Sequence, residues 1–160
     1  NLISYLRNIE IIAWTTLIFA ILLYFADKFK VNKKLNTKLD LKTVFVIGCF
    51  QILALIPGVS RSGIVITAGR FLKFDRYDST KISFYLSIPV IAGASFLGFK
   101  DLYKETADFN SMILLTVFLS YFFSYFTIKY FLIFVKRFDL KLFVIYRILL
   151  SFLLFGIIYF

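Results

Sequence analysis

The sequence contains no histidine and only one cysteine, Cys49, among its 160 residues. Without histidine, these residues cannot supply a histidine nucleophile, a histidine general base or a histidine-ligated metal. A single cysteine excludes a disulfide within the chain and a metal site made of cysteines. Glycine and proline are also scarce, with 7 and 2 residues. Together with the high apolar content described next, this scarcity excludes a collagen-like or disordered low-complexity chain.

Apolar residues dominate what is present. Hydrophobic residues make up 61% of the chain and aromatic residues 21%, whereas soluble domains contain roughly 45–50% apolar residues. The composition therefore predicts an integral membrane protein. The first residue is Asn1 and the only methionine is Met112, so we expect the chain to be part of a longer protein.

Four apolar segments are long enough to cross a bilayer core, which needs roughly 20 apolar residues of helix. We expect an all-α, polytopic membrane domain over 1–160 in which these four segments are transmembrane helices. Their predicted bounds are 9–26, 79–99, 111–135 and 142–160.

The stretch 41–74 is also apolar, but it is interrupted. Its first run stops at Pro57-Gly58, and the second resumes only at Gly63. Neither run can span a bilayer alone, so the pattern predicts a re-entrant helical hairpin. Irregular backbone at membrane depth is tolerated only where it lines a polar cavity or is buried in protein.

The formal net charge of +10 does not indicate nucleic-acid binding, because the basic residues lie in loops between apolar runs. Basic clusters occur in 27–42, 70–81 and 136–141, and an acidic loop occupies 101–108. If 41–74 enters and leaves on the same side, all three basic clusters share one face. The positive-inside rule then predicts cytoplasmic basic loops and a C-terminus outside.

The turn of the predicted hairpin, residues 56–63, has the sequence IPGVSRSG. Its glycines allow unusual backbone angles, its serines supply hydroxyls, and its arginine supplies a planar fork that suits phosphate. A helix that opens near Gly63 would direct free N–H groups to the same place. We therefore predict phosphate binding by Gly58, Ser60, Arg61, Ser62 and Gly63. The alternative is an ordinary helix N-terminus whose arginine reaches the lipid headgroups.

Residues Pro57 to Gly63 resemble the Pro-Gly-x-Ser-Arg-Ser-Gly signature of the undecaprenyl-diphosphate phosphatases of the bacitracin-resistance type. Gln51 precedes the signature as in that family. The segment Ser83 to Pro89 resembles a downstream family segment, and Tyr146-Arg147 resembles a pair in its last helix. The resemblance covers nearly the whole chain.

The resemblance implies an enzyme of the bacterial inner membrane, built from two inverted repeats that each contain a re-entrant hairpin. Such enzymes hydrolyse a C55 isoprenoid diphosphate, which recycles the lipid carrier for peptidoglycan synthesis and confers bacitracin resistance. This chain would be the second repeat, with Ser60 and Arg61 as catalytic, phosphate-contacting residues.

The resemblance also implies partners. The family's glutamate-rich segment and its histidine, which handle a divalent metal (Mg²⁺ or Ca²⁺), would lie in a missing N-terminal half. We therefore expect no metal ligands in this chain and no nucleic-acid partner, and the resemblance leaves a homodimer open.

The chain departs from the family where many members have Ala-Thr after the loop glycine, because it has Ile64-Val65. Thr67 is the nearest substitute for the lost hydroxyl, and with Gln51 it is a further candidate for the site. For Arg147, within the last span, we expect a structural pairing across the bundle.

Two other classes of function remain open from the sequence. Inverted repeats with broken helices also occur in carriers, so the chain could be half of a transporter or flippase for polyprenyl phosphates or other anions. It could also be an inactive fragment. The histidine-dependent membrane lipid phosphatases are excluded, because the chain has no histidine.

Overall fold

A computed structural model describes residues 8–31, 33, 35, 40–104 and 111–159 of the chain. Over these residues the fold is helical, and the only β-type pairing is an isolated bridge between Lys33 and Phe74. The predicted all-α class is confirmed. The helices are α2 (Ile9–Asp27), α3 (Leu41–Ile52), the short 3₁₀ helix η1 (Leu53–Leu55), α4 (Arg61–Phe71), α5 (Arg76–Lys104), α6 (Ser111–Arg137) and α7 (Lys141–Tyr159).

Four of these helices, α2, α5, α6 and α7, are long and apolar enough to cross a membrane. The prediction of four candidate spans is therefore confirmed. Helix α5 runs through Pro89 without interruption and ends later than predicted, at Lys104. Parts of the predicted loops 27–42 and 101–108, including Glu105 and Asp108, lie outside the described residues.

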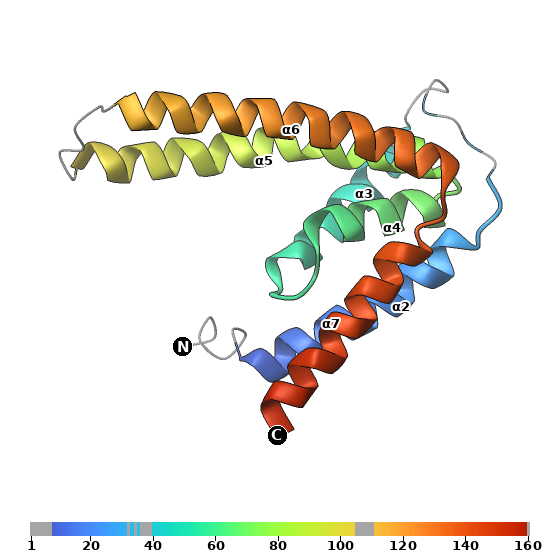
Figure 1. Ribbon diagram of the computed structural model, residues 1–160. Coiled ribbons are helices and arrows are strands. Elements are labelled where there is room, and N and C mark those ends of the chain that lie inside the picture. Colours follow the sequence, from blue (N-terminus) through green and yellow to red (C-terminus); the bar gives the residue numbers. More distant parts are fainter. Residues whose placement is uncertain (1–7, 32, 34, 36–39, 105–110, 160) are drawn as a thin grey trace.

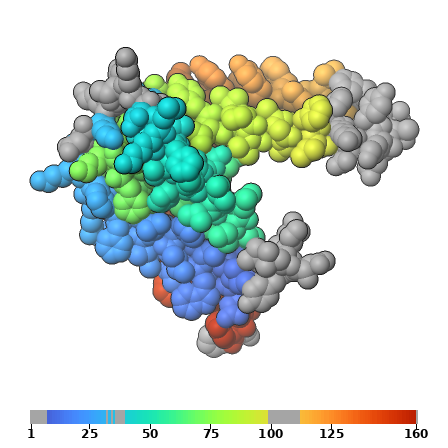
Figure 2. Space-filling model, turned by 180° about the vertical axis from the view of Figure 1, so that it is seen from behind, coloured from blue at the N-terminus to red at the C-terminus, as the bar shows by residue number. Residues whose placement is uncertain are grey.

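The helices form two pairs with a hairpin between them (Figure 1). Helices α2 and α7 lie side by side, α5 and α6 form a long arm, and α3 and α4 occupy the angle between the two pairs. Seen from behind, the far part of the arm stands clear of the other helices (Figure 2). Nearly all side chains of α6 between positions 112 and 130 are exposed, and most of them are apolar, as expected of a helix that faces lipid.

Helix α4 is the buried centre of the fold. Every residue from Ile64 to Arg70 is buried, and α4 packs against α2, α3 and α5. A Cβ atom added to Gly69 would lie 2.7 Å from Ser79 Oγ and 2.9 Å from Ser79 Cβ. The close approach of α4 to α5 at this point therefore requires a glycine.

A network of ion pairs joins the ends of α2, α4 and α5. Asp27 binds Arg76 through contacts of 2.7 and 3.0 Å, and its carboxylate lies 3.4 Å from Arg70 Nε. Arg70 is 3% exposed and donates to the carbonyl oxygens of Asp27, Phe29 and Phe74. Carbonyls at helix ends lack intrahelical partners, so Arg70 satisfies acceptors that would otherwise be buried without a donor.

Arg76 extends the network outward to Asp139 in the α6–α7 connection, at 2.6 Å. The pKa of Asp139 lies below its ordinary value, first because Lys141 hydrogen-bonds to it and then because of the positive charge of Arg76. Asp139 therefore stays ionised at neutral pH, and its side chain is 43% exposed.

We predict that Asp27→Asn lowers the free energy of unfolding by about 3–5 kcal/mol, because it leaves the buried Arg70 without a counter-charge. Asp139→Asn is the matched control. It removes a partly exposed partner of Arg76, which Asp27 also binds, so its cost is much smaller. Thermal unfolding in detergent, followed by circular dichroism, measures the loss of stability in both variants. Equal losses in the two variants would contradict the assignment of Asp27 as the centre of the network.

Candidate functional site

The predicted loop is the turn between η1 and α4. The chain is extended at Ile56, and Gly58 has a φ of 88°, which L side chains rarely adopt. Ser60 is the N-cap of α4, and its hydroxyl accepts a hydrogen bond of 3.2 Å from the amide of Gly63. The amides of Arg61 and Ser62, in the first helical turn, have no carbonyl partner within the helix.

Helices α2 and α7 hold this turn through its carbonyl oxygens. The hydroxyl of Thr15 lies 2.7 Å from the Pro57 oxygen, and Thr16 donates to the Gly58 oxygen at 3.3 Å. From α7, Arg147 Nη2 donates to the same Gly58 oxygen at 2.8 Å. The turn therefore lies at the level of the middle of both helices.

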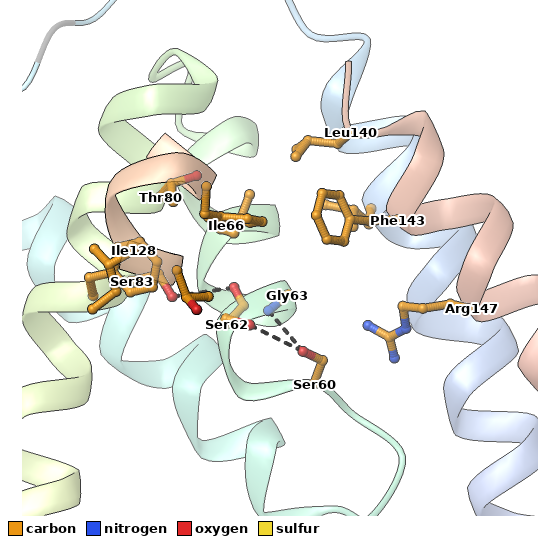
Figure 3. A pocket seen from close by; sticks show the side chains of 14 residues that line it. Ser60, Ser62, Gly63, Ile66, Thr80, Ser83, Ile128, Leu140, Phe143 and Arg147 are labelled. Carbon is orange, nitrogen blue, oxygen red and sulfur yellow. Dashed lines mark hydrogen bonds between the residues drawn. The ribbon is translucent and has the colours of Figure 1, made fainter. Parts of the chain in front are cut away.

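Arg147 pairs across the bundle as predicted, but its partner is a carbonyl oxygen of the loop and not an acidic side chain. It is 8% exposed and makes no ion pair with an acidic side chain among the described residues. Its guanidinium points from α7 toward Ser60 and Gly63 (Figure 3). A Cβ atom added to Gly63 would lie 3.0 Å from Arg147 Nη1. A buried arginine without a counter-charge in an apolar bundle is a candidate functional group.

A cavity of about 260 Å³ adjoins these groups. Its polar end is formed by Ser60, Ser62, Gly63 and Arg147, with the Ser83 hydroxyl 3.5 Å from the Ser62 carbonyl oxygen, and Thr80 lies farther along the cavity (Figure 3). The other walls are largely apolar and come from five helices and one connection: Leu23 of α2, Ile66 of α4, Phe84 of α5, Ile128 and Phe131 of α6, Leu140 of the α6–α7 connection and Phe143 of α7.

This arrangement suits an amphipathic anion. At the polar end, one guanidinium, two serine hydroxyls and the N-terminus of α4 offer donors and positive potential to a phosphate. Beyond it, the apolar walls can accept a hydrocarbon chain. The Ser60 and Ser62 hydroxyl oxygens lie 3.3 Å apart, close enough to contact one anion together.

The structure separates Arg61 from these groups. Arg61 and Gln51 line a different cavity, of about 490 Å³, between α3 and α5. Successive residues of a helix are rotated by about 100°, so the side chains of Arg61 and Ser62 leave α4 in different directions. The Gln51 Oε1 atom is buried and has no hydrogen-bond partner among the described residues. Gln51 and Arg61 therefore face a region in which polar groups still lack partners.

Of the other predicted residues, Gly58 contributes its carbonyl to Arg147 and Gly63 lines the first cavity. Thr67 lies elsewhere. It is fully buried and donates at 2.7 Å to the carbonyl of Gly63 in its own helix. Its hydroxyl is thus committed to the backbone of α4 and does not line either cavity.

Among the residues that the structure describes, no three acidic or cysteine side chains lie close enough together to hold a metal ion. Carboxylates are the ligands that Mg²⁺ and Ca²⁺ prefer. We therefore derive no chemical step through a metal from these residues.

Comparisons with known proteins point to one family. The family model described as "Bacitracin resistance protein BacA" matches residues 1–153. A protein of Pelagibacter ubique named undecaprenyl-diphosphatase is 57% identical over 153 residues, which are 96% of this chain and 60% of that protein. A protein of the same name from Elusimicrobium minutum is 44% identical over 145 residues, 91% of this chain and 55% of its own.

A third relative, from Saccharophagus degradans and also named undecaprenyl-diphosphatase, is 41% identical over 158 residues, which are 98% of this chain and 59% of that protein. This chain thus spans somewhat more than half the length of the curated relatives that it matches.

We predict that Gly58→Ala displaces the loop. The added Cβ would overlap Thr15 Oγ1 and lie 2.7 Å from the Ile12 carbonyl oxygen, and alanine at positive φ costs about 1–2 kcal/mol even without a clash. The free energy of unfolding should therefore fall by more than this amount.

Gly48→Ala provides the matched control, because Gly48 lies in α3 with nothing within 4 Å of the added Cβ. That change should be neutral or stabilise the chain by up to about 1 kcal/mol. If both variants unfolded like the unmodified chain, the described packing of the loop against α2 would be wrong.

Proposed function

Because the chain belongs to the bacitracin resistance protein BacA family, we propose that it supplies the phosphate-binding half of an enzyme that hydrolyses undecaprenyl diphosphate. The observation that carries this proposal is the polar end of the first cavity. There Arg147, Ser60, Ser62 and the N-terminus of α4 surround one small space. The named activity of the relatives supports the choice of substrate.

The shape of the cavity supports a lipid diphosphate over a soluble one. Ser60, Ser62 and Arg147 gather at one end of the cavity (Figure 3). Aromatic side chains of α5, α6 and α7 also line it, namely Phe84, Phe131 and Phe143. We propose that the diphosphate lies against the first turn of α4 and that the first isoprene units follow the aromatic walls.

The proposed reaction is attack by water on the terminal phosphorus. A new P–O bond forms from the water oxygen, and the bond from that phosphorus to the bridging oxygen breaks. The products are inorganic phosphate and the lipid monophosphate, with the proton of the water passing to a base. Arg147 and the free amides of Arg61 and Ser62 would hold the phosphate oxygens, and Arg61 would stabilise the charge that develops during transfer.

The base and any divalent metal, Mg²⁺ or Ca²⁺, would come from residues outside this chain. We propose that they approach from the side of Arg61 and Gln51. The unpartnered Gln51 Oε1 supports this side, since a buried acceptor without a donor is costly and is normally satisfied by a neighbouring group. The two arginines would then flank the phosphoryl group at the first turn of α4.

We further propose that the protein resides in the bacterial cytoplasmic membrane with its basic loops inside. The ends of α2, α5 and α6 that carry Lys28, Arg76 and Lys136 meet at one end of the bundle. The positive-inside rule places this end in the cytoplasm.

A chimera tests the proposed function. The segment of the Pelagibacter ubique relative that this chain matches is replaced by residues 1–153 of this chain, and phosphate release from undecaprenyl diphosphate is measured in lipid vesicles with added Mg²⁺. Hydrolysis by the chimera at a rate near that of the relative supports the proposal. A folded chimera that releases no phosphate contradicts it, and lipid translocation without hydrolysis would favour a carrier.

Within an active chimera, Arg61→Ala and Arg147→Ala should each lower kcat/KM by roughly 10²–10³-fold, because each removes a charged donor from the phosphoryl group. Lys129→Ala is the control, since Lys129 is exposed on α6 and lines neither cavity. Near-normal hydrolysis by the Arg147 variant would show that this side chain only supports the Gly58 carbonyl.

A further inference from the structure

A third cavity, of about 490 Å³, lies where the ends of α2, α4, α5 and α6 meet. It is separate from the two cavities that adjoin the loop of residues 56–63. Four cationic side chains line it, Lys30, Arg70, Arg76 and Lys136, together with the carboxylates of Asp27 and Asp75. Its lining is therefore net positive.

Both carboxylates already have partners. Asp27 is bound by Arg76 and lies beside Arg70, and Asp75 accepts a hydrogen bond of 2.6 Å from the amide of Asp78 at the start of α5. The two lysines differ from the arginines. Lys30 and Lys136 are exposed, and neither forms an ion pair among the described residues. The Lys136 ammonium lies over the Tyr77 ring, 4.2 Å from its centroid, a contact that does not neutralise its charge. Both lysine charges can therefore still attract an external anion.

The cavity also lies at a defined level in the bundle. Asp27 is the last residue of α2, Arg76 is the first of α5, and Lys136 is in the last turn of α6. The ends of three candidate spans therefore border the cavity. The ends of membrane-spanning helices lie at the level of the phosphate groups of a bilayer leaflet. Phe29, Val31 and Val135 provide apolar walls beside the charged groups.

We propose that this basic cavity binds the phosphate group of an anionic phospholipid in the adjoining leaflet, with Lys30 and Lys136 as its contacts. Basic pockets between membrane helices on the cytoplasmic side are suited to such headgroups. The buried Asp27–Arg70–Arg76 network forms the floor of the site and keeps the helix ends in place. The proposal depends on membrane insertion and not on hydrolysis.

Native mass spectrometry of the full 160-residue chain, released from nanodiscs of phosphatidylcholine and phosphatidylglycerol, tests the site by counting retained lipid. The unmodified chain should retain phosphatidylglycerol in preference to phosphatidylcholine. Lys30→Gln combined with Lys136→Gln should weaken this retention by on the order of tenfold. Lys42→Gln combined with Lys129→Gln removes the same charge from exposed positions outside the cavity and should leave retention unchanged.

Lys30→Arg combined with Lys136→Arg keeps the charge and should retain the lipid, which separates loss of binding from loss of folding. Equal retention of the two lipids would overturn the proposal. So would equal losses in the cavity and control variants, because that would indicate diffuse surface charge. Displacement of phosphatidylglycerol by millimolar inorganic phosphate would assign the cavity to a free anion and overturn the lipid assignment.

Discussion

A turn at the mid-height of apolar helices must find donors for its own carbonyl oxygens, and this constraint organises the structure. At membrane depth, irregular backbone is tolerated only where it is hydrogen-bonded within the protein or lines a polar cavity. The oxygens of Pro57 and Gly58 accept from Thr15, Thr16 and Arg147. Two helices that are remote in sequence are thereby attached to the turn. Because Arg147 donates to the Gly58 carbonyl, its buried guanidinium also lies near the N-terminus of α4, where a phosphate would bind.

The polar side chains of the turn point to two different sides, because the turn leads directly into α4. Ser60, Ser62 and Gly63 share one cavity with Arg147, whereas Arg61 and Gln51 share another. The first face is largely satisfied within the chain and continues into an aromatic groove. The second contains a buried acceptor without a partner. This difference supports the proposal that the second face meets the residues that supply the base.

Hydropathy and loop charge were enough to predict the fold class, the four candidate spans and the interruption at Pro57-Gly58, because these depend on local composition. Predicted and observed bounds agree within about two residues for α2, α6 and α7. The role of Arg147 could not be predicted, since pairing, snorkelling and loop contact all suit an arginine within a span. The packing of α7 against α2 determines which of these contacts Arg147 makes. Ser151 of α7 is part of this packing, since it donates a hydrogen bond to the Ala13 carbonyl of α2. Likewise, because Ser60, Arg61 and Ser62 are adjacent in sequence, the sequence predicts that they form one phosphate site. The rotation of successive residues around α4 instead places Arg61 in a different cavity from the two serines.

The most direct measurement is a cryo-electron microscopy map of the active chimera in nanodiscs with a slowly hydrolysed isoprenoid diphosphate analogue. The account predicts phosphate density within hydrogen-bonding distance of Arg147 and the first-turn amides of α4, with the hydrocarbon density beside Phe84, Phe131 and Phe143. Phosphate density away from the first turn of α4, with Arg147 contacting only the Gly58 carbonyl, would contradict it.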